Sequence, residues 1–264
     1  MKGIKFALFF CIIIALSACG INATQSAQGT EEATSSAQAE TYVLTLSHSF
    51  PTASFVHTFM EWFDEEIRAK SNGKLALEIY PNAQLVPPDQ EMTAILQGQI
   101  DMSHASSPVM AGFDPIWNIY ELPFAFDYDP ENPEIFLDNR MAFNNSDNGG
   151  GKIKQKMEEN GLKVLSLGFV DMFGSVYTTD ASNIVTGPDS VQGLKLRSPG
   201  GLIGPETLDA LGASSVTIAG AEVITALQQN LVDGLLTTPI YAHDVNLPVE
   251  SFSVVPLFNT VTPL

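Results

Sequence analysis

The chain has 264 residues, of which 45% are hydrophobic, and its 30 acidic and 12 basic side chains give a formal net charge of −18. A surface this acidic repels phosphate backbones and anionic lipid headgroups, and no basic patch interleaved with aromatic residues occurs, so composition argues against nucleic-acid binding. Both cysteines, Cys11 and Cys19, lie in the N-terminal segment, which argues against a disulfide framework or a cysteine metal site in the rest of the chain.

Residues 1–19 predict a bacterial lipoprotein signal peptide. Lys2 and Lys5 form a basic start, and residues 6–16 form an apolar run shorter than the roughly 17 to 25 residues that span a bilayer. The following Leu-Ser-Ala-Cys resembles a lipobox, in which Cys19 would be lipidated and become the mature N-terminus. The alternative is an ordinary cleaved signal with an incidental cysteine. The lipobox is favoured because Cys19 stands where a lipobox requires it and has no downstream partner.

Residues 20–41 predict a disordered tether that precedes a folded body. They are rich in Ala, Ser, Thr, Gln and Glu and lack aromatic residues, so they bury too little surface to offset the entropy of ordering. As a flexible coil the tether reaches roughly 25 Å. The body exceeds the common single-domain size and suits two lobes. We expect lobe 1 at 42–168, lobe 2 at 169–259, and the start of a return to lobe 1 at 260–264.

Strand and helix patterns alternate along the body, as an α/β architecture of βαβ units requires. In the first lobe, apolar side chains recur at helical spacing from Val56 to Ile67, and Asn72-Gly73 ends that helix. The other elements predicted there are strands at 43–48, 75–79, 100–103 and 162–167 and helices at 88–98 and 151–160. In the second lobe, the patterns predict strands at 176–179, 194–196 and 235–238 and helices at 203–211 and 221–229.

Arg197 is the most informative residue, because it is one of only three arginines in this acidic chain. Its planar fork suits a carboxylate, although an arginine after a short strand more commonly forms a structural ion pair. The stretch at 193–199, Gly-Leu-Lys-Leu-Arg-Ser-Pro, resembles a motif of the solute-binding proteins of tripartite ATP-independent periplasmic (TRAP) transporters, the DctP-like family. In that family the arginine clamps the carboxylate of an organic acid.

The resemblance extends from residue 42 to residue 240 through short pieces in the family's order and approximate spacing. No single piece is specific, but their ordered set is. The pieces lie at 71–74, 80–85, 98–101, 122–124, 178–179, 210–213, 222–223 and 226–234. The resemblance implies an α/β, two-lobed periplasmic-binding-protein type II fold with the ligand in the interlobe cleft. Because resembling sequences continue well past Leu264, we expect the fold to be truncated at the C-terminus.

The resemblance also implies which residues line the cleft. It places the lining of the first lobe near His48, Ser49 and Ser106, and it places the far wall at Thr237 and Thr238. Each has an ordinary alternative: a serine or threonine at a strand end commonly caps a helix or a turn. For His48 the alternative is a satisfied polar residue at the mouth of the cleft.

Two positions depart from the family pattern. Val176 stands where many relatives carry a second arginine, and Gly220 stands where they tend to hold an aromatic residue two positions before the glutamate that corresponds to Glu222. Both departures predict a pocket that is less cationic and roomier than usual. They favour a ligand with one carboxylate and a bulkier or more apolar body over a compact dicarboxylate.

No constellation of catalytic residues is present, and we expect no enzymatic activity, cofactor or metal. The Gly-Gly-Gly-Lys at 149–152 lacks the glycine five residues earlier that a phosphate-binding loop requires, and Ile153 fills its Ser/Thr position. No Gly-x-Ser-x-Gly elbow occurs, and the four histidines show no metal-ligand spacing.

The sequence therefore predicts an extracytoplasmic solute-binding receptor, in the periplasm or on the outer face of the cell membrane. It would be lipid-anchored at Cys19, capture an organic acid through Arg197 and deliver it to TRAP membrane subunits. Its contact with the membrane would be the lipid anchor only, and nucleic acid would not be a partner. One alternative is a sensor lipoprotein that presents its loaded form to a signalling receptor. A second is a secreted hydrolase.

Overall fold

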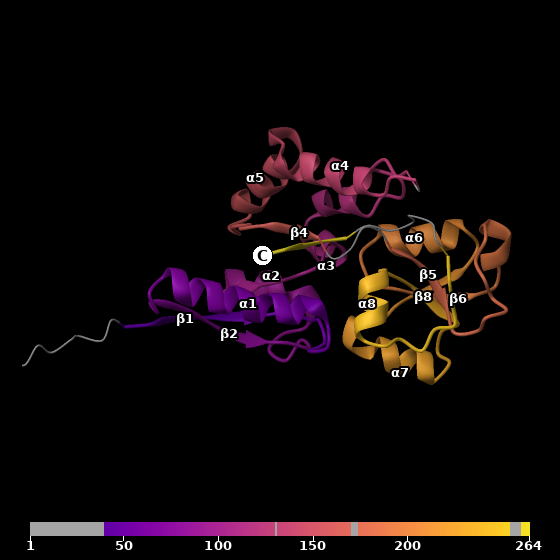
Figure 1. Ribbon diagram of the computed structural model, residues 1–264, viewed down its shortest axis with the longest axis horizontal. Coiled ribbons are helices and arrows are strands. Elements are labelled where there is room, and N and C mark those ends of the chain that lie inside the picture. The colour runs from indigo at the N-terminus through magenta and orange to yellow at the C-terminus, as the bar shows by residue number, and fades with distance from the viewer. Residues whose placement is uncertain (1–39, 130, 170–173, 254–259) are drawn as a thin grey trace, which may run out of the picture. The chain divides into compact units, whose positions relative to one another are not determined.

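The computed structural model describes residues 40–129, 131–169, 174–253 and 260–264 (Figure 1). The predicted signal peptide and nearly all of the predicted tether lie outside these residues. Residues 39–264 form one compact unit, and its described sheets and hydrophobic cores fall into two lobes. The N-terminal lobe comprises residues 40–169 together with 260–264, and the C-terminal lobe comprises 174–253. Residues 170–173 and 254–259, which separate these parts in the sequence, lie outside the described residues, so the predicted lobe boundaries stay predictions.

The described strands form three sheets. The N-terminal lobe holds a parallel sheet of order β2-β1-β3 and an antiparallel pair β10-β4, and the C-terminal lobe holds a mixed sheet of order β7-β6-β8-β5-β9. The strands are β1 (Tyr42–Ser47), β2 (Leu75–Tyr80), β3 (Met102–Ser103), β4 (Leu167–Phe169), β5 (Ser175–Thr178), β6 (Lys195–Ser198), β7 (Ser214–Thr217), β8 (Gly234–Thr237), β9 (Ser251–Phe252) and β10 (Val261–Pro263).

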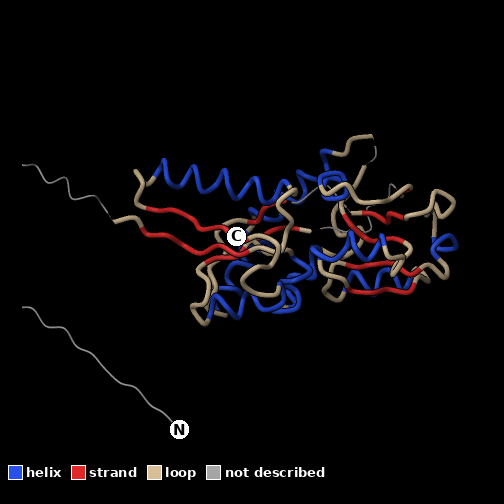
Figure 2. Tube along the Cα trace, turned by 90° about the horizontal axis from the view of Figure 1, so that it is seen from below, coloured by secondary structure: helices blue, strands red, loops and turns tan. Residues whose placement is uncertain are grey.

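Helices connect these strands, as the α/β class predicts. Figure 2 shows the longest of them along one side of the N-terminal strands, with shorter helices on the other side. The helices are α1 (Phe55–Lys70), α2 (Glu91–Leu96), α3 (Ser107–Phe113), α4 (Glu134–Asn145), α5 (Lys152–Glu159), α6 (Ile203–Ala210), α7 (Val223–Gln228) and α8 (Pro239–Asp244). Short 3-10 or π turns are η1 (Pro88–Gln90), η2 (Pro115–Tyr120), η3 (Asp147–Gly151), η4 (Pro188–Val191) and η5 (Gly220–Glu222).

Helix α1 begins and ends where the sequence predicts. The side chain of Ser54 caps it by accepting a hydrogen bond from the amide of Val56, and Asn72 beyond its end has a φ of 53°. Its buried Met60 packs with Leu46 of β1 and Leu77 of β2. This packing fixes one face of the parallel sheet, so the end of β1 is held in a defined position.

The second core of the N-terminal lobe is aromatic and includes residues from the far end of the chain. Trp117, Tyr120 and Phe136 are almost fully buried and pack with Val261 of β10. The hydroxyl of Ser107 lies 3.1 Å from that of Thr260. Residues 260–264 therefore belong structurally to the N-terminal lobe.

The predicted strand at 162–167 is wrong in position, because the strand observed there, β4, begins only at Leu167. Leu162 and Val164 pack as loop residues in the aromatic core, so their apolar character reflects burial without pairing. The partner of β4 is β10, about ninety residues later in the chain, and local periodicity carries no information about such a partner.

The sheet of the C-terminal lobe is built on buried leucines. Leu196 of β6 and Leu235 and Leu236 of β8 have no exposed surface. Gly234 starts β8 because a Cβ atom there would lie 2.1 Å from the carbonyl oxygen of Tyr177 on β5. The close approach lets β8 pair with both β5 and β6, and the ends of β6 and β8 emerge together at one edge.

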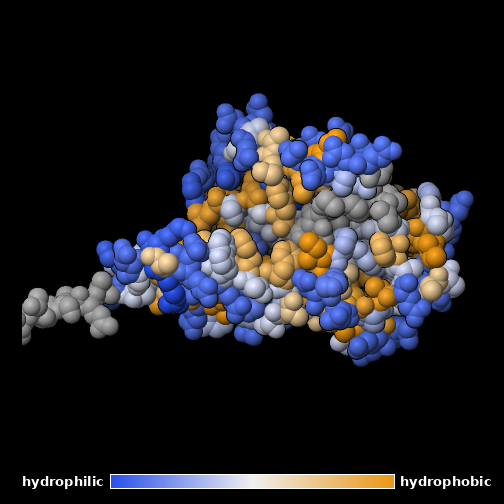
Figure 3. All heavy atoms as spheres, in the orientation of Figure 1, coloured by the Kyte–Doolittle hydropathy of each residue, from blue (hydrophilic) through white to orange (hydrophobic). Residues whose placement is uncertain are grey.

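Hydrophilic residues cover much of the periphery of the face seen in Figure 3, and hydrophobic residues gather there only in small groups. Within the described part of the chain, every helix is too short or too polar to span a bilayer.

Candidate functional site

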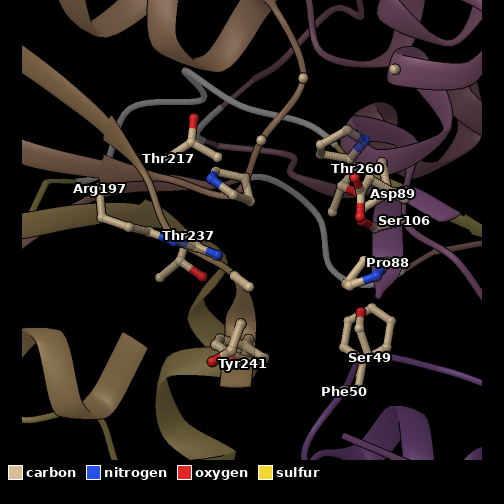
Figure 4. Close-up of a pocket in the computed structure, with 18 of the residues that line it drawn as sticks. Ser49, Phe50, Pro88, Asp89, Ser106, Arg197, Thr217, Thr237, Tyr241 and Thr260 are labelled. Atoms are coloured by element: carbon tan, nitrogen blue, oxygen red, sulfur yellow. Dashed lines mark hydrogen bonds between the residues drawn. The ribbon is translucent and has the colours of Figure 1, made fainter. Parts of the chain in front are cut away.

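A pocket of about 410 Å³ lies between the two lobes. Figure 4 shows Arg197, Thr237 and Tyr241 of the C-terminal lobe facing Ser49 and Ser106 of the N-terminal lobe across a gap. The described lining residues are Ser49, Phe50, Pro51, Pro88, Asp89, Ser106, Pro108, Val109, Gly112, Arg197, Pro199, Gly200, Gly201, Thr217, Ala219, Gly220, Thr237, Thr238, Tyr241 and Thr260. The volume suits a small organic molecule, and most of the lining is apolar.

Arg197 is the cation of this described lining, and it is deeply buried, with 4% of its surface exposed. It stands on β6 between the parallel neighbours β7 and β8. Its Nε donates a hydrogen bond to the carbonyl oxygen of Ile218 at 2.8 Å, and its Nη1 donates to that of Leu236 at 3.4 Å. Two backbone carbonyls therefore hold the guanidinium, and Figure 4 shows it turned toward the gap.

The charge of Arg197 has no protein counterion among the described residues. The ion pairs found there join other side chains, so the alternative of an internal Arg-carboxylate pair is not what the described structure contains. Burial lowers the pKa of the Arg197 guanidinium to about 10, which still leaves it charged at neutral pH. An uncompensated buried charge is costly to a folded protein, and a bound anion would relieve that cost.

Two hydroxyl groups of the pocket lining, those of Ser106 and Thr238, do not cap the helices that they precede. Ser106 stands at the N-cap of α3 and Thr238 at the N-cap of α8, yet neither side chain makes a capping hydrogen bond. The Oγ1 atom of Thr238 is buried and has no partner among the described residues. These hydroxyls are therefore available to a molecule in the pocket.

Tyr241 and Asp89 add polar groups that the sequence did not point to. The Tyr241 hydroxyl donates to the carbonyl oxygen of Gly220 at 3.2 Å, and burial raises the pKa of Tyr241. Asp89, in η1, gives the N-terminal wall a carboxylate. The helical step from Thr238 to Tyr241 could have indicated the tyrosine, whereas Asp89 reads in sequence only as a helix start.

The structure brings six of the eight predicted lining residues into the pocket. They are Arg197, Ser49, Ser106, Gly220, Thr237 and Thr238. His48 lies behind the lining with no exposed surface, and it hydrogen-bonds to His57 and to the amide of Phe50. Val176 is also fully buried and packs in a core cluster with Leu196 and Leu236. On β5 its side chain lies inside the lobe and not in the pocket lining. The predicted link between a valine at this position and a less cationic pocket therefore has no lining residue to support it.

The pocket has few groups suited to chemistry. Its described lining contains no histidine, cysteine or lysine. No cluster of His, Cys, Asp or Glu in the described part of the chain has a geometry that could hold a metal ion. The arrangement supports recognition of an anion by a buried cation surrounded by hydroxyls and apolar surface.

Comparison with known proteins gives a consistent result. The family model described as bacterial extracellular solute-binding protein, family 7 (DctP), matches residues 46–247. The C4-dicarboxylate-binding periplasmic protein DctP of Rhodobacter capsulatus is 29% identical over 182 residues, which are 67% of this chain and 50% of that protein. The chain spans about half the length of several such curated relatives.

Solved structures share the fold. A TRAP periplasmic solute-binding protein of Haemophilus influenzae with bound L-gulonate has a TM-score of 0.68 and 24% identity, over 84% of this chain and 69% of that one. Another, from Shewanella oneidensis with bound succinate, has a TM-score of 0.73 and 18% identity, over 84% and 70% of the two chains. These likenesses confirm the predicted α/β two-lobed fold.

Proposed function

The chain belongs to the bacterial extracellular solute-binding proteins of family 7, the DctP family of TRAP transporters, and we propose that it captures an organic acid and delivers it to TRAP membrane subunits. The observation that carries the proposal is the buried, uncompensated charge of Arg197 in the wall of the interlobe pocket. A ligand carboxylate placed against it would supply the missing counterion.

The energy of this contact is substantial but incomplete. Two charge-assisted hydrogen bonds at roughly 1.5 to 3 kcal/mol each supply about 3 to 6 kcal/mol, whereas a micromolar Kd requires roughly 8 kcal/mol. The apolar lining and the free hydroxyls of Ser106 and Thr238 would supply the remainder as the lobes enclose the ligand.

The charges of the pocket favour a monocarboxylate that also carries hydrogen-bond donors. Arg197 is the cation of the described lining, and Asp89 is its carboxylate on the other wall. Asp89 would repel a second carboxylate and accept a hydrogen bond from a hydroxyl. Of the two ligands bound by the structural relatives above, L-gulonate has this chemistry and succinate does not.

The cellular setting follows from the N-terminal sequence. In this proposal Cys19 is lipidated, residues 20–41 tether the folded body to the membrane, and the loaded receptor meets the transporter outside the cytoplasm. In this proposal the receptor performs no catalysis, and support for this point comes from membership of a solute-binding receptor family.

A thermal-shift screen with matched acids and amides tests the proposal. Each acid, for example L-gulonate or succinate, is paired with the corresponding neutral amide and added to the purified chain and to its Arg197→Met variant. We expect at least one acid to raise the Tm of the parent, its amide to have little effect, and the variant not to respond. Equal responses to acid and amide, or equal responses of parent and variant, would remove the proposed role of Arg197.

A further inference from the structure

Three of the chain's four histidines gather behind the N-terminal wall of the pocket. The rings of His48 and His57 have centroids 5.3 Å apart, and the ring of His104 lies 6.3 Å from that of Phe50. His48 and His104 are almost fully buried. These histidines show no metal-ligand spacing in the sequence, and no metal-binding group is found among the described residues, so their grouping needs another explanation.

Phe50 connects this histidine cluster (His48, His57 and His104) to the pocket. It lies in a run of three lining residues, Ser49, Phe50 and Pro51. Its ring also packs against the hydrophobic cluster of the C-terminal lobe that contains Tyr241. The position of Phe50 therefore sets both one wall of the pocket and one contact between the lobes.

The backbone of Phe50 is held through both its amide and its carbonyl oxygen. Its carbonyl oxygen accepts a hydrogen bond from the amide of Asn82 at 3.1 Å. Its own amide donates to Nδ1 of His48 at 3.2 Å. The second bond is a side-chain turn from residue i to residue i+2, of the kind that asparagine and aspartate commonly make. His48 is thus the side chain that fixes the start of the wall.

The hydrogen bonds determine the tautomer of His48. Because Nδ1 accepts the amide proton of Phe50, the neutral imidazole carries its proton on Nε2. That proton then points to Nδ1 of His57, 3.1 Å away. In turn Nε2 of His57 carries a proton and lies 3.5 Å from a carboxylate oxygen of Glu61. Burial lowers the pKa of His48 to about 4, so the ring stays neutral near pH 7.

We propose that His48 is a positioning residue for ligand binding, whose Nδ1 fixes the backbone of Phe50 and hence the aromatic wall of the pocket. This inference rests on the proposed function for its effect on affinity. Its structural part, the orientation of Phe50 by His48, does not need a ligand. His48 touches no ligand in this account and acts through Phe50.

Two substitutions separate this role from general stability. In His48→Asn the side-chain oxygen lies near the former Nδ1 and can still accept the amide of Phe50. In His48→Gln the longer amide reaches toward His57 but is poorly placed for that turn. Both variants keep a polar side chain in a buried site, and their Tm values record any common loss of stability.

The measurement is calorimetric titration of L-gulonate and of succinate into the purified chain and both variants, with hydrogen exchange of the Phe50 amide followed by NMR. We expect His48→Asn to keep the Kd of the tighter acid within about 3-fold and to keep the amide protected. We expect His48→Gln to raise that Kd by about 10-fold or more and to lose the protection. Equal Kd values or equal protection in the two variants would overturn the inference.

The two proposals fail in distinguishable ways. If the parent binds neither acid, the result counts against the proposed function for these ligands, and the exchange of the Phe50 amide still decides whether His48 positions the wall. If the parent binds an acid but the variants do not differ, the proposed function stands and the role of His48 is rejected.

Discussion

The three arginines of the chain occupy three different environments. Arg68 is half-exposed and pairs with Asp64 on α1. Arg140 is fully buried, donates to the carbonyl oxygen of Thr260, and lies over the rings of Phe136 and Phe169. Arg197 is buried against two carbonyl oxygens and forms no ion pair with another described residue. Its charge is therefore placed at a cost to the ligand-free protein, as is common at binding sites.

Because the buried charge of Arg197 is costly in the ligand-free protein, we expect its removal to change stability independently of binding. Replacing Arg197 with methionine removes the uncompensated charge and keeps an apolar chain of similar length. We expect Arg197→Met to raise the free energy of unfolding of the ligand-free protein by about 1 to 3 kcal/mol, measured by urea denaturation. The control Arg68→Met breaks a half-exposed pair and one bond to the carbonyl oxygen of Leu77, and it should lower the free energy of unfolding by about 1 kcal/mol. A marked loss of stability in Arg197→Met would contradict this prediction. It would show that the two hydrogen bonds from Arg197 to backbone carbonyls stabilise the protein by more than the burial of the charge destabilises it.

At the scale of elements, helix α1 is stabilised by a residue from the opposite lobe. The amide of Phe55 at its first turn donates to Oδ2 of Asp244, at the end of α8, at 2.9 Å. Negative charge at a helix N-terminus is favourable, and this bond satisfies an amide that has no partner within the helix. The contact joins the lobes close to the pocket wall formed by Phe50.

Removing this contact should weaken α1 and the contact between the lobes. We expect Asp244→Ala to lower the free energy of unfolding by about 1 to 2 kcal/mol, because the amide of Phe55 loses its acceptor. Asp244→Asn should cost less, about 0.3 to 1 kcal/mol, because only the charge is lost. Asp138→Asn, on the exposed face of α4, is the matched control. Urea denaturation that ranks Asn as more damaging than Ala would contradict this assignment.

For the whole molecule, four buried titratable groups make stability depend on pH. Burial raises the pKa of Glu91 and of Glu121 to about 8, and it lowers the pKa of His48 to about 4 and of His104 to about 3. The buried glutamates stay protonated at pH values where those of the unfolded chain have released their protons. Their contribution to the free energy of unfolding therefore falls as pH rises from about 4.5 to 8. The histidines stay neutral in the folded protein at pH values where those of the unfolded chain take up protons, so their contribution to the free energy of unfolding falls as pH drops below about 6.5.

The two trends oppose each other below pH 6.5, but above it, of these four described groups, only the glutamates change protonation. We therefore expect the free energy of unfolding to fall between pH 6.5 and 8, by about 1.4 kcal/mol per pH unit for each buried glutamate. Chemical denaturation across this range measures the slope. Glu91→Gln and Glu121→Gln should each flatten it, and a slope that is unchanged in both variants would contradict the assignment.

The sequence predicted elements that are encoded locally. The helical spacing from Val56 to Ile67, the Gly-Leu-Lys-Leu-Arg-Ser-Pro stretch and the apolar run at 235–238 each indicate their own element, and α1, β6 and β8 are confirmed. Elements whose limits depend on distant partners were missed or misplaced: β4 follows its pairing with β10, and α3, α4 and α8 were not predicted.

The residues of the pocket also divide into those that the local sequence indicates and those whose place depends on tertiary packing. Arg197 could be predicted because a motif surrounds it. His48 and Val176 could not be assigned to the lining or to the interior, because the side of a strand or loop that a residue occupies depends on tertiary packing. The fold brings Asp89, Phe50 and Tyr241 into the same pocket as Arg197, and no local sequence pattern predicts that they line it together.

The most direct test of the central claim is calorimetric titration of the acid that gives the largest thermal shift. We expect saturable binding of one acid per chain by the parent, and at least about 100-fold weaker binding both of the neutral amide and by folded Arg197→Met. Retention of parent-like affinity in Arg197→Met would contradict the claim that this buried guanidinium is the counterion of the ligand.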